Sequence, residues 1–308
     1  MSSKGVKVDY SVRPAKHVER KLMIDTLGYL KELWYRISKY KYIWFGSVFY
    51  VDFILFHKFL WIHNMICFEK KQMLNRMNFN KPYDFIEIIP YNFSDYYHKL
   101  DFSNPTLLWL DYEDWLNEEK ANDLWDIVWN KIIEWSIIIL TLHVNLPVDD
   151  VDREEYIDKF AWLFEKYPNP NIEKKDILPK NISEVITGII KSKISDSLLL
   201  SWNGMSYKTL FNYSYKDDAQ MMTVGFIFDK KDELNKIDID KFDSNKPANI
   251  RLPIITNREK FFIDSNLQEI QRSIEEKTLN LPFEIKEDDV KNYIKFYKEY
   301  PNFSEILY

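Results

Sequence analysis

The stretch YIWFGSVFYVDFILFHKFLWIHNMICFE, residues 42–69, decides the fold class of this chain. It opens with a short apolar run, passes through a single glycine, Gly46, and continues into a segment long enough for a helix. It closes with a second apolar run that leads into Glu69. Neither run alternates apolar with polar residues, which is typical of strands buried on both faces. The stretch therefore predicts a strand, a helix and a second strand parallel to the first.

The same alternation of apolar runs and helix-length segments recurs further along the chain. It is the signature of repeated strand–helix–strand units, whose right-handed crossovers place helices on both faces of one sheet. The predicted strands are Tyr42–Phe45, Met65–Phe68, Phe85–Ile89, Thr106–Leu110 and Ile137–Val144, and the helices between them are Phe49–Leu60, Lys71–Phe79, Ser94–Leu100 and Asn117–Trp135. Two further helices are predicted over Asp152–Tyr167 and Lys180–Leu200.

The two ends of the chain add a hairpin and more helices. The β-rich runs Tyr207–Tyr215 and Met221–Phe228 flank a short polar turn, which predicts an antiparallel hairpin. A helical pattern begins at Pro14 and runs to about Ser38, and another helix is predicted near Asp288–Tyr300. We therefore expect an α/β fold: a doubly wound, mainly parallel seven-stranded sheet closed by an antiparallel hairpin, with an N-terminal helix and a helical C-terminal extension.

Three segments are expected from this order. Residues 1–40 are predicted to form a tail and a helix packing on the core, residues 41–230 the Rossmann-like domain, and residues 231–308 a linker and a helical extension. The segment 229–249 is highly charged and has few large apolar groups, so we expect a solvated loop or linker there.

Composition excludes several classes of protein. The 308-residue chain has 42 Lys and Arg against 48 Asp and Glu, a net charge of −6, which disfavours general nucleic-acid binding and polybasic membrane binding. Its 6 glycines are too few for a Walker-type phosphate loop. The single cysteine, Cys67, forms no intramolecular disulfide and suits a reducing compartment. The N-terminus lacks a secretion signal and the longest apolar stretch is short of a bilayer span, so we expect a cytoplasmic protein without membrane association.

The ends of the first two predicted strands carry candidate binding residues. Ligands of doubly wound sheets bind beyond the carboxyl ends of the strands, near the switch in strand order. Phe45, Gly46 and Ser47 follow the first strand, where a glycine lets the backbone approach a ligand, although a simple tight turn explains them equally well. Glu69 ends the second strand, about 20 residues after Gly46, where a carboxylate commonly accepts hydrogen bonds from ribose hydroxyls. The alternative is a solvated glutamate.

The third and fourth predicted strands also end in polar and aromatic residues. Asn92 and Phe93 could contact an adenine amine and stack on its ring, or Asn92 could merely cap the next helix. Asp111 could orient a substrate, hydrogen-bond a cofactor or act as a base, and Tyr112 could wall a pocket. The alternative for this pair is a capping segment for the helix that follows.

Three further features have less support. His143 and Asn145 would complete an oxygen-rich cation site with Asp111, but no second ligand spacing supports one, so we predict no metal. Asp52 either faces the same cleft or sits in a helical first turn that favours a carboxylate. A basic cluster at the start of the first helix is expected on a solvated face, unless it gates an anionic substrate or binds a partner. It comprises Arg13, Lys16, His17, Arg20 and Lys21.

Together these features resemble a class I, Rossmann-like S-adenosylmethionine-dependent methyltransferase. The resemblance is carried by Tyr42–Ser47, Glu69, Tyr91–Asp95, Asp111-Tyr112 and the hairpin Tyr207–Phe228. The stretches YSVRPAKHVERK, YIWFGSVFYVDFILFHK and LLWLDYE also resemble a group of bacterial O-methyltransferase-like proteins. This chain departs from the family in its first loop, which is reduced from a glycine-rich sequence to Phe45-Gly46-Ser47.

The resemblance implies S-adenosylmethionine as cofactor and methyl transfer to an acceptor that the sequence does not identify, with oxygen as one option. It implies catalytic roles for Asp111 and Tyr112, and cofactor-binding roles for Phe45, Gly46, Ser47, Glu69, Asn92, Phe93 and Asp111. The alternative is an inactive methyltransferase-like module that senses a nucleotide-like ligand or pairs with a partner protein. A nicotinamide oxidoreductase shares the early topology, but the single glycine and the closing hairpin disfavour it. A homo-oligomer is compatible with either function.

Overall fold

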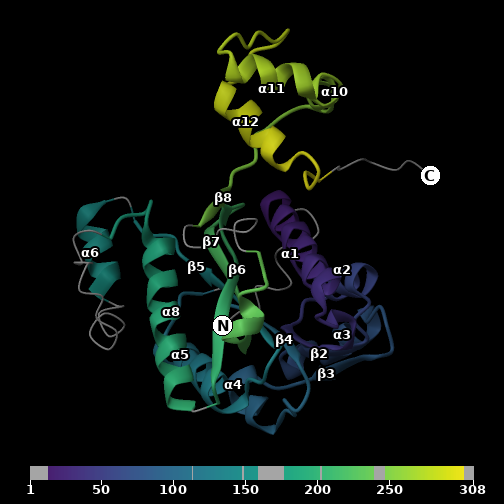
Figure 1. The fold of residues 1–308 in the computed structure, drawn as a ribbon, viewed down its shortest axis with the longest axis vertical. Coiled ribbons are helices and arrows are strands. Elements are labelled where there is room, and N and C mark those ends of the chain that lie inside the picture. Colours follow the sequence, from purple (N-terminus) through teal and green to yellow (C-terminus); the bar gives the residue numbers. More distant parts are fainter. Residues whose placement is uncertain are drawn as a thin grey trace.

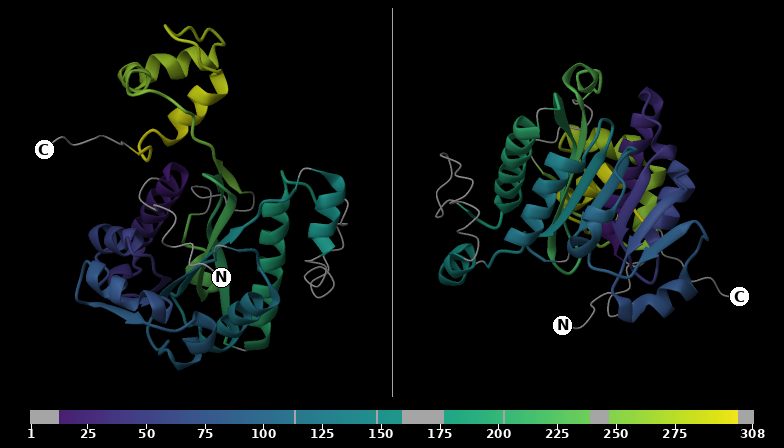
Figure 2. Two further views of the ribbon diagram at one scale, coloured as in Figure 1. Left: turned by 180° about the vertical axis from the view of Figure 1, so that it is seen from behind. Right: turned by 90° about the horizontal axis from the view of Figure 1, so that it is seen from below.

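The computed structural model describes residues 13–112, 114–147, 149–158, 177–201, 203–238 and 247–301. Within these ranges one eight-stranded sheet has the strand order β3-β2-β1-β4-β5-β7-β6-β8. Helices lie on both faces of this sheet (Figures 1 and 2). The doubly wound α/β prediction is therefore confirmed.

The strands follow the predicted apolar runs closely. They are β1 (Lys41–Phe45), β2 (Asn64–Phe68), β3 (Ile86–Ile89), β4 (Thr106–Asp111), β5 (Ile137–His143), β6 (Met205–Lys216), β7 (Gln220–Lys230) and β8 (Ala248–Ile250). The first five are mutually parallel, and β7 pairs antiparallel with both β5 and β6, so the hairpin closes the sheet as predicted.

The predicted number of seven strands is wrong by one. Strand β8 pairs parallel with β6, from Tyr213 opposite Ala248 to Tyr215 opposite Ile250. Strand β8 has only three residues beside a charged segment, so its sequence contains no apolar run that would predict a strand. It forms by pairing with the open edge of β6. The expected solvated linker is also wrong in its described part, because β7 reaches Lys230 and the side chains of Leu234 and Ile237 are buried.

Each predicted helix has a counterpart among the described residues, with ends that differ from the predicted ones, and α9, α10 and α11 were not predicted individually. The helices are α1 (Pro14–Leu33), α2 (Val51–Leu60), α3 (Leu74–Asn80), α4 (Phe93–Tyr96), α5 (Glu118–Asp126), α6 (Asp150–Asp158), α8 (Ile182–Ser201), α9 (Lys231–Leu234), α10 (Asn257–Ser265), α11 (Leu267–Glu275) and α12 (Glu287–Phe296). The remainder of the helix predicted over Asp152–Tyr167 lies outside the described residues.

Two apolar layers sandwich the sheet, because successive strand residues point to opposite faces. Tyr42 and Trp44 of β1 pack with α1, α2 and Met77 of α3 on one face. Ile43 of β1 packs with α5 and α8 on the other face. All of β1 except its last residue, Phe45, is thus buried, which explains why its sequence shows no polar alternation.

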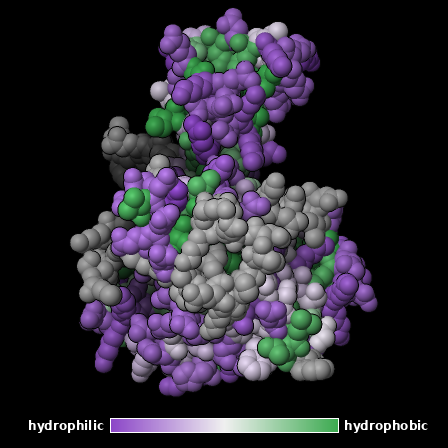
Figure 3. Space-filling view, turned by 90° about the vertical axis from the view of Figure 1, so that its left-hand side faces the viewer, coloured by the Kyte–Doolittle hydropathy of each residue, from purple (hydrophilic) through white to green (hydrophobic). Residues whose placement is uncertain are grey.

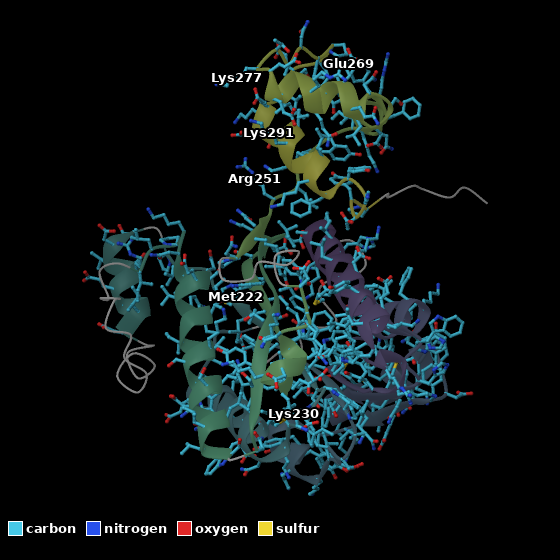
Figure 4. All side chains as sticks on the ribbon, in the orientation of Figure 1. Met222, Lys230, Arg251, Glu269, Lys277 and Lys291 are labelled. Carbon is cyan, nitrogen blue, oxygen red and sulfur yellow. The ribbon has the colours of Figure 1, made fainter. Side chains whose placement is uncertain are left out.

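Helices α10, α11 and α12 form a lobe with a small core of its own, built from Ile263, Ile270, Val290 and Tyr293. Figure 4 marks the two ends of β7 by Met222 and Lys230, and the lobe lies beyond the Met222 end. Since β7 runs antiparallel to β5, this is the side of the carboxyl ends of the parallel strands. On the face of the lobe shown in Figure 3, hydrophilic side chains predominate, with some hydrophobic ones among them.

A buried ion pair joins the N-terminal helix to the helix that follows β1. The guanidinium of Arg20 donates to both carboxylate oxygens of Asp52, with Nε–Oδ1 at 2.5 Å and the second N···O distance at 3.1 Å. Both side chains are almost fully buried. The expectation of a solvated basic face is therefore wrong for Arg20 and for Lys16, which is only 3% exposed. Asp52 lies in the first turn of α2, as one alternative held, and its burial is offset by Arg20.

Replacing Arg20 with methionine is expected to lower the free energy of unfolding by about 3–5 kcal/mol, because the Asp52 carboxylate would stay buried without its partner. Urea unfolding of Arg20→Met measures the loss. The matched control is Arg36→Met, at an exposed position, with an expected change within about 0.5 kcal/mol. Equal losses in the two variants would contradict the assignment, and Arg20→Met combined with Asp52→Leu should recover much of the stability.

Candidate active site

The sheet brings three of the predicted site residues to one level. Phe45 lies opposite Phe68, and Trp44 lies opposite Trp109, so Gly46, Glu69 and Asp111 follow at matching positions on neighbouring strands. Adjacent strands are about 4.8 Å apart, which puts the backbones of Glu69 and Asp111 about 10 Å apart with Gly46 between them. Along the chain, β2 and β3 are added on one side of β1, and β4 and β5 are added on its other side. The carboxyl ends of β1 and β4 therefore form the topological switch point of the sheet.

Successive residues of a strand point to opposite faces of the sheet, so the side chains at the carboxyl ends of these strands lie on two faces. Trp44, Cys67 and Trp109 belong to the layer under α1, α2 and α3, so Gly46, Glu69 and Asp111, each two residues further on, face that side. Polar candidates therefore share one face. The aromatic candidates Phe45, Phe93 and Tyr112 pack with the opposite layer.

The loop after β1 is tight and mostly buried. The Gly46 amide donates to the carbonyl oxygen of Phe68 at 2.8 Å. A Cβ at Gly46 would come within 2.2 Å of Cys67 Sγ and 2.7 Å of Met77 Cε, so close packing requires glycine here. Ser47 is 5% exposed, and its Oγ has no hydrogen-bond partner in the described ranges. Tyr50, which precedes α2, has φ of 50°, a left-handed conformation that is unusual for a bulky residue.

Glu69 and Asn92 lie nearer to the surface. Glu69 is half-buried, and its Oε1 accepts the backbone amide of Lys70 at 2.7 Å. Asn92 is exposed, and its side-chain amide donates to Asp95 Oδ2 at 3.0 Å. Asn92 occupies the cap position of α4, but its side chain makes no capping hydrogen bond there. Both side chains are accessible to a ligand approaching the carboxyl edge.

The aromatic candidates form a packed cluster. The Phe45 ring centroid lies 5.6 Å from that of Phe93 and 5.4 Å from that of Tyr112, and Phe93 also meets Phe68 at 5.3 Å. Phe93 is 6% exposed, so most of its ring surface is used in this packing. The buried hydroxyl of Tyr112 has no hydrogen-bond partner in the described part of the chain. Burial raises the pKa of Tyr112, so this hydroxyl stays protonated near neutral pH.

Asp111 is held by a side chain that was not among the predicted site residues. Its Oδ1 lies 3.6 Å from Nζ of Lys16 in α1, and 16% of the Asp111 side chain is exposed at the edge. Behind it, the Trp109 indole N–H donates to Thr141 Oγ1 at 2.9 Å, which supports β4 against β5. Asp111 therefore joins a buried polar layer to the surface.

Sequence reasoning placed Lys16 only in a basic cluster that could gate an anionic substrate or bind a partner, and it missed Glu19. Nζ of Lys16 lies 3.0 Å from Glu19 Oε2 and 3.1 Å from the hydroxyl of Tyr215 in β6. An oppositely charged pair three residues apart on a helix was the available signal, but such pairs usually lie on exposed faces. Only the long-range contact between Lys16 and Asp111 connects this pair to the carboxyl ends of the strands.

His143 lies against the ring of Trp115, with centroids 5.8 Å apart. Among the described residues, no group of three or more His, Cys, Asp or Glu side chains could hold a metal ion. A cavity of about 520 Å³ lies at the opposite edge of the sheet, between Pro105, Trp135 and Met205, away from every predicted site residue.

The strand order and the closing antiparallel hairpin are those of the class I methyltransferase fold. A family model described as "Putative O-methyltransferase" matches residues 8–308, and the chain belongs to that family. S-adenosylmethionine is the expected cofactor of such a protein. No curated protein matches the sequence.

Two solved structures are similar to this chain at low identity. A LepI variant in complex with SAH and a substrate analogue is 13% identical, with a TM-score of 0.32 over 61% of this chain and 43% of that chain. A "putative caffeoyl-CoA O-methyltransferase" from Staphylococcus aureus is 14% identical, with a TM-score of 0.31 over 66% of this chain and 82% of that chain. The matched part spans less than half of the LepI chain. Neither likeness bears on the substrate of this protein.

The residues at the switch point fit S-adenosylmethionine in their chemistry. Glu69 offers an accessible carboxylate for hydroxyl groups, Ser47 a buried hydroxyl without a partner, and Asp111 a partly exposed carboxylate. Gly46 differs from an open glycine cradle, because its amide hydrogen and the space beside it are taken up by neighbouring strand β2 and by Met77.

None of the helices in the described ranges has the length and apolar character that a membrane span requires.

Gly46→Ala is expected to lower the free energy of unfolding by about 1–3 kcal/mol, because the added methyl group overpacks the space held by Cys67 and Met77. Thermal or urea unfolding measures the change. Gly28→Ala is the matched control: it lies within α1 with nothing within 4 Å of its added Cβ, and should gain about 0.5–1 kcal/mol from helix propensity. Unchanged stability in Gly46→Ala would show that packing is not the reason for this glycine.

Proposed function

We propose that this protein transfers a methyl group from S-adenosylmethionine to an oxygen acceptor at the carboxyl edge of β2, β1 and β4. The observation that carries the proposal is the common level of Gly46, Glu69 and Asp111 across these three neighbouring strands. Membership of the O-methyltransferase family supports the reaction class.

The proposed cofactor contacts follow from the chemistry of each side chain. The Glu69 carboxylate accepts hydrogen bonds from the two ribose hydroxyls. Ser47 supplies a hydroxyl next to the N-terminal end of α2, where a carboxylate is favoured by the helix dipole. Asn92 offers an amide to the base, and Phe45 and Phe93 form the apolar wall below it. When bound, the cofactor supplies a methyl group on a positively charged sulfur, which an incoming nucleophile can attack.

Asp111 and Tyr112 are the proposed catalytic residues. The Asp111 carboxylate would accept a hydrogen bond from the acceptor hydroxyl and would take up its proton when the oxygen is methylated. The residue thereby orients the acceptor oxygen toward the methyl group, and positioning of this kind accounts for much of the rate enhancement in such reactions. Tyr112 forms the side wall and excludes water from that position.

The proposed division of the chain follows the same assignment. Residues 41–230 carry the methyl-transfer domain, residues 1–40 form a tail and a helix that packs on it, and residues 231–308 form the C-terminal extension. The separate small core of α10, α11 and α12 supports this division. We also propose a reducing, cytoplasmic location, since the lone Cys67 is a buried thiol.

Glu69→Ala is expected to weaken binding of S-adenosylhomocysteine by about 1–3 kcal/mol, because charge-assisted hydrogen bonds to the ribose are lost. Isothermal titration calorimetry measures the affinity. Glu87→Ala is the matched control. Glu87 is an exposed glutamate within β3, away from the carboxyl ends of β2, β1 and β4, and the variant should bind as the unaltered protein does. Equal affinity of the two variants would remove Glu69 from the site.

A transfer assay tests the reaction itself. The protein is incubated with methyl-labelled S-adenosylmethionine and a panel of phenols and alcohols, and the products are identified by mass spectrometry. Asp111→Asn should lower the rate of transfer to any accepted substrate by about 100-fold or more, the size typical of a lost acid–base group. Absence of cofactor binding in the unaltered protein would overturn the proposed function.

A further inference from the structure

We propose that Lys120 of α5 binds a carboxylate group of the acceptor, so that the acceptor is an elongated hydroxyl compound with its negative charge remote from the methylated oxygen. The inference deepens the proposed function, and its consequence for methyl transfer rests on that function. Lys120 was not among the predicted site residues. It lies in the first turn of α5, the helix that follows β4 along the chain.

Lys120 is held over the aromatic ring that forms the side wall of the proposed site. Its Nζ lies 5.0 Å from the ring centroid of Tyr112, a distance typical of cation–π contacts. The same atom donates to the backbone carbonyl oxygen of Trp115 at 3.1 Å. The backbone amide of Lys120 donates to the side chain of Asn117, the cap of α5, at 2.9 Å. Contacts of its backbone and of its side chain thus place the ammonium group beside Tyr112.

The ammonium group of Lys120 differs from the buried cations of this protein. Lys16, Arg20 and Lys41 are buried, and each has a carboxylate oxygen at 3.4 Å or less. Lys120 is half-buried, yet it forms no ion pair with a carboxylate of the described residues. A partly desolvated charge without an ionic partner is unfavourable for folding, so its position favours a role in binding.

The electrostatic surroundings of Lys120 leave room for an anionic ligand. Burial lowers the pKa of Lys120, and the nearby carboxylates Asp114 and Glu119 offset this effect only in part. Both of these carboxylates are on exposed residues. An anion next to the ammonium group would supply the missing opposite charge in a partly desolvated place, where the attraction is stronger than in water. The arrangement therefore favours a negatively charged ligand.

The position of Lys120 defines the shape of the acceptor. Asp111 contacts Lys16 of α1, whereas Tyr112 packs with α5 on the opposite face of the sheet. An acceptor whose hydroxyl group meets Asp111 and whose carboxylate meets Lys120 must therefore pass across the end of β4. The aromatic side chains of Tyr112 and Trp115 favour an aromatic ring in the part between the two groups. A hydroxyphenyl carboxylate has these features.

Isothermal titration calorimetry with three hydroxyphenyl carboxylates tests the assignment, with and without S-adenosylhomocysteine. They are para-hydroxybenzoate, para-hydroxyphenylacetate and para-hydroxyphenylpropionate, and each is compared with its neutral carboxamide of nearly the same shape. The unaltered protein should bind the best carboxylate about 10- to 100-fold more tightly than its carboxamide, the range expected for a hydrogen bond to a charged group. Equal affinity within every pair, or no binding of any member, would overturn the proposal.

Variants assign this preference to one side chain. Lys120→Met should bind the carboxylate no more tightly than the carboxamide, and Lys120→Arg should keep most of the preference because the positive charge remains. Lys99→Met is the matched control. Nζ of Lys99 lies 5.2 Å from the ring centroid of Tyr96, but the residue is exposed, so the preference should be unchanged. A preference that persists in Lys120→Met would overturn the assignment.

Urea unfolding separates binding from a structural role. Removal of a partly desolvated charge without an ionic partner should leave Lys120→Met as stable as the unaltered protein, or more stable. Lower stability together with unchanged carboxylate affinity would show that Lys120 only anchors the loop through the Trp115 carbonyl, and would overturn the proposal. If Lys120→Met does not fold, Lys120→Gln replaces it, because glutamine can still donate to that carbonyl but has no charge.

The transfer assay with the same ligands separates this proposal from the proposed function. Preference for carboxylates that depends on Lys120, together with methyl transfer to their hydroxyl groups, supports both. The same preference in a protein that does not bind S-adenosylhomocysteine would support the Lys120 site and overturn the proposed function. Methyl transfer at equal rates to carboxylates and carboxamides would overturn only the role of Lys120.

Discussion

Neutralisation of buried charge is the constraint on which the organisation of this protein depends. Beside α1, two cations and two carboxylates lie almost entirely out of water, next to the partly exposed carboxylate of Asp111. A buried charge is stable only beside an opposite charge. Arg20 and Asp52 satisfy each other, and Lys16 is shared between Glu19 and Asp111. These pairs fix α1, α2 and β4 relative to one another. The carboxyl ends of the central strands are thereby held in place by elements far apart in the sequence.

The strand segments and their parallel arrangement were predictable because parallel strands are buried on both faces. Stretches such as Thr106–Leu110 contain almost no polar residues, and only a strand in the middle of a sheet is wrapped so completely. The hairpin was predictable from two β-rich runs around a polar turn. From those elements alone it followed that Gly46, Glu69 and Asp111 would meet at one edge, and their register agrees.

Other features depended on contacts that no local pattern records. Lys16 and Arg20 resemble exposed helical residues in sequence, since their partners come from β4 and α2. Gly46 has the spacing of a ligand-binding glycine, but the close approach of Cys67 and Met77 also demands it. Strand β8 and helix α10 carry weak periodicity, so their place is set by β6 and by packing within the lobe. Helix α11, in contrast, has an apolar stripe of Leu267, Ile270 and Ile274 at helical spacing, a signal that could have predicted it.

The two edge strands of the sheet, β3 and β8, differ from its central strands in length and in charge. On one side β3 covers only Ile86–Ile89 and turns Glu87 to solvent, and on the other β8 covers only Ala248–Ile250. Long, flat, apolar borders would offer unpaired amides and carbonyls to strands of other molecules. The two edge strands are short, and one of them carries an exposed carboxylate. Both features protect this hydrophobic sheet against pairing with strands of other molecules and hence against aggregation.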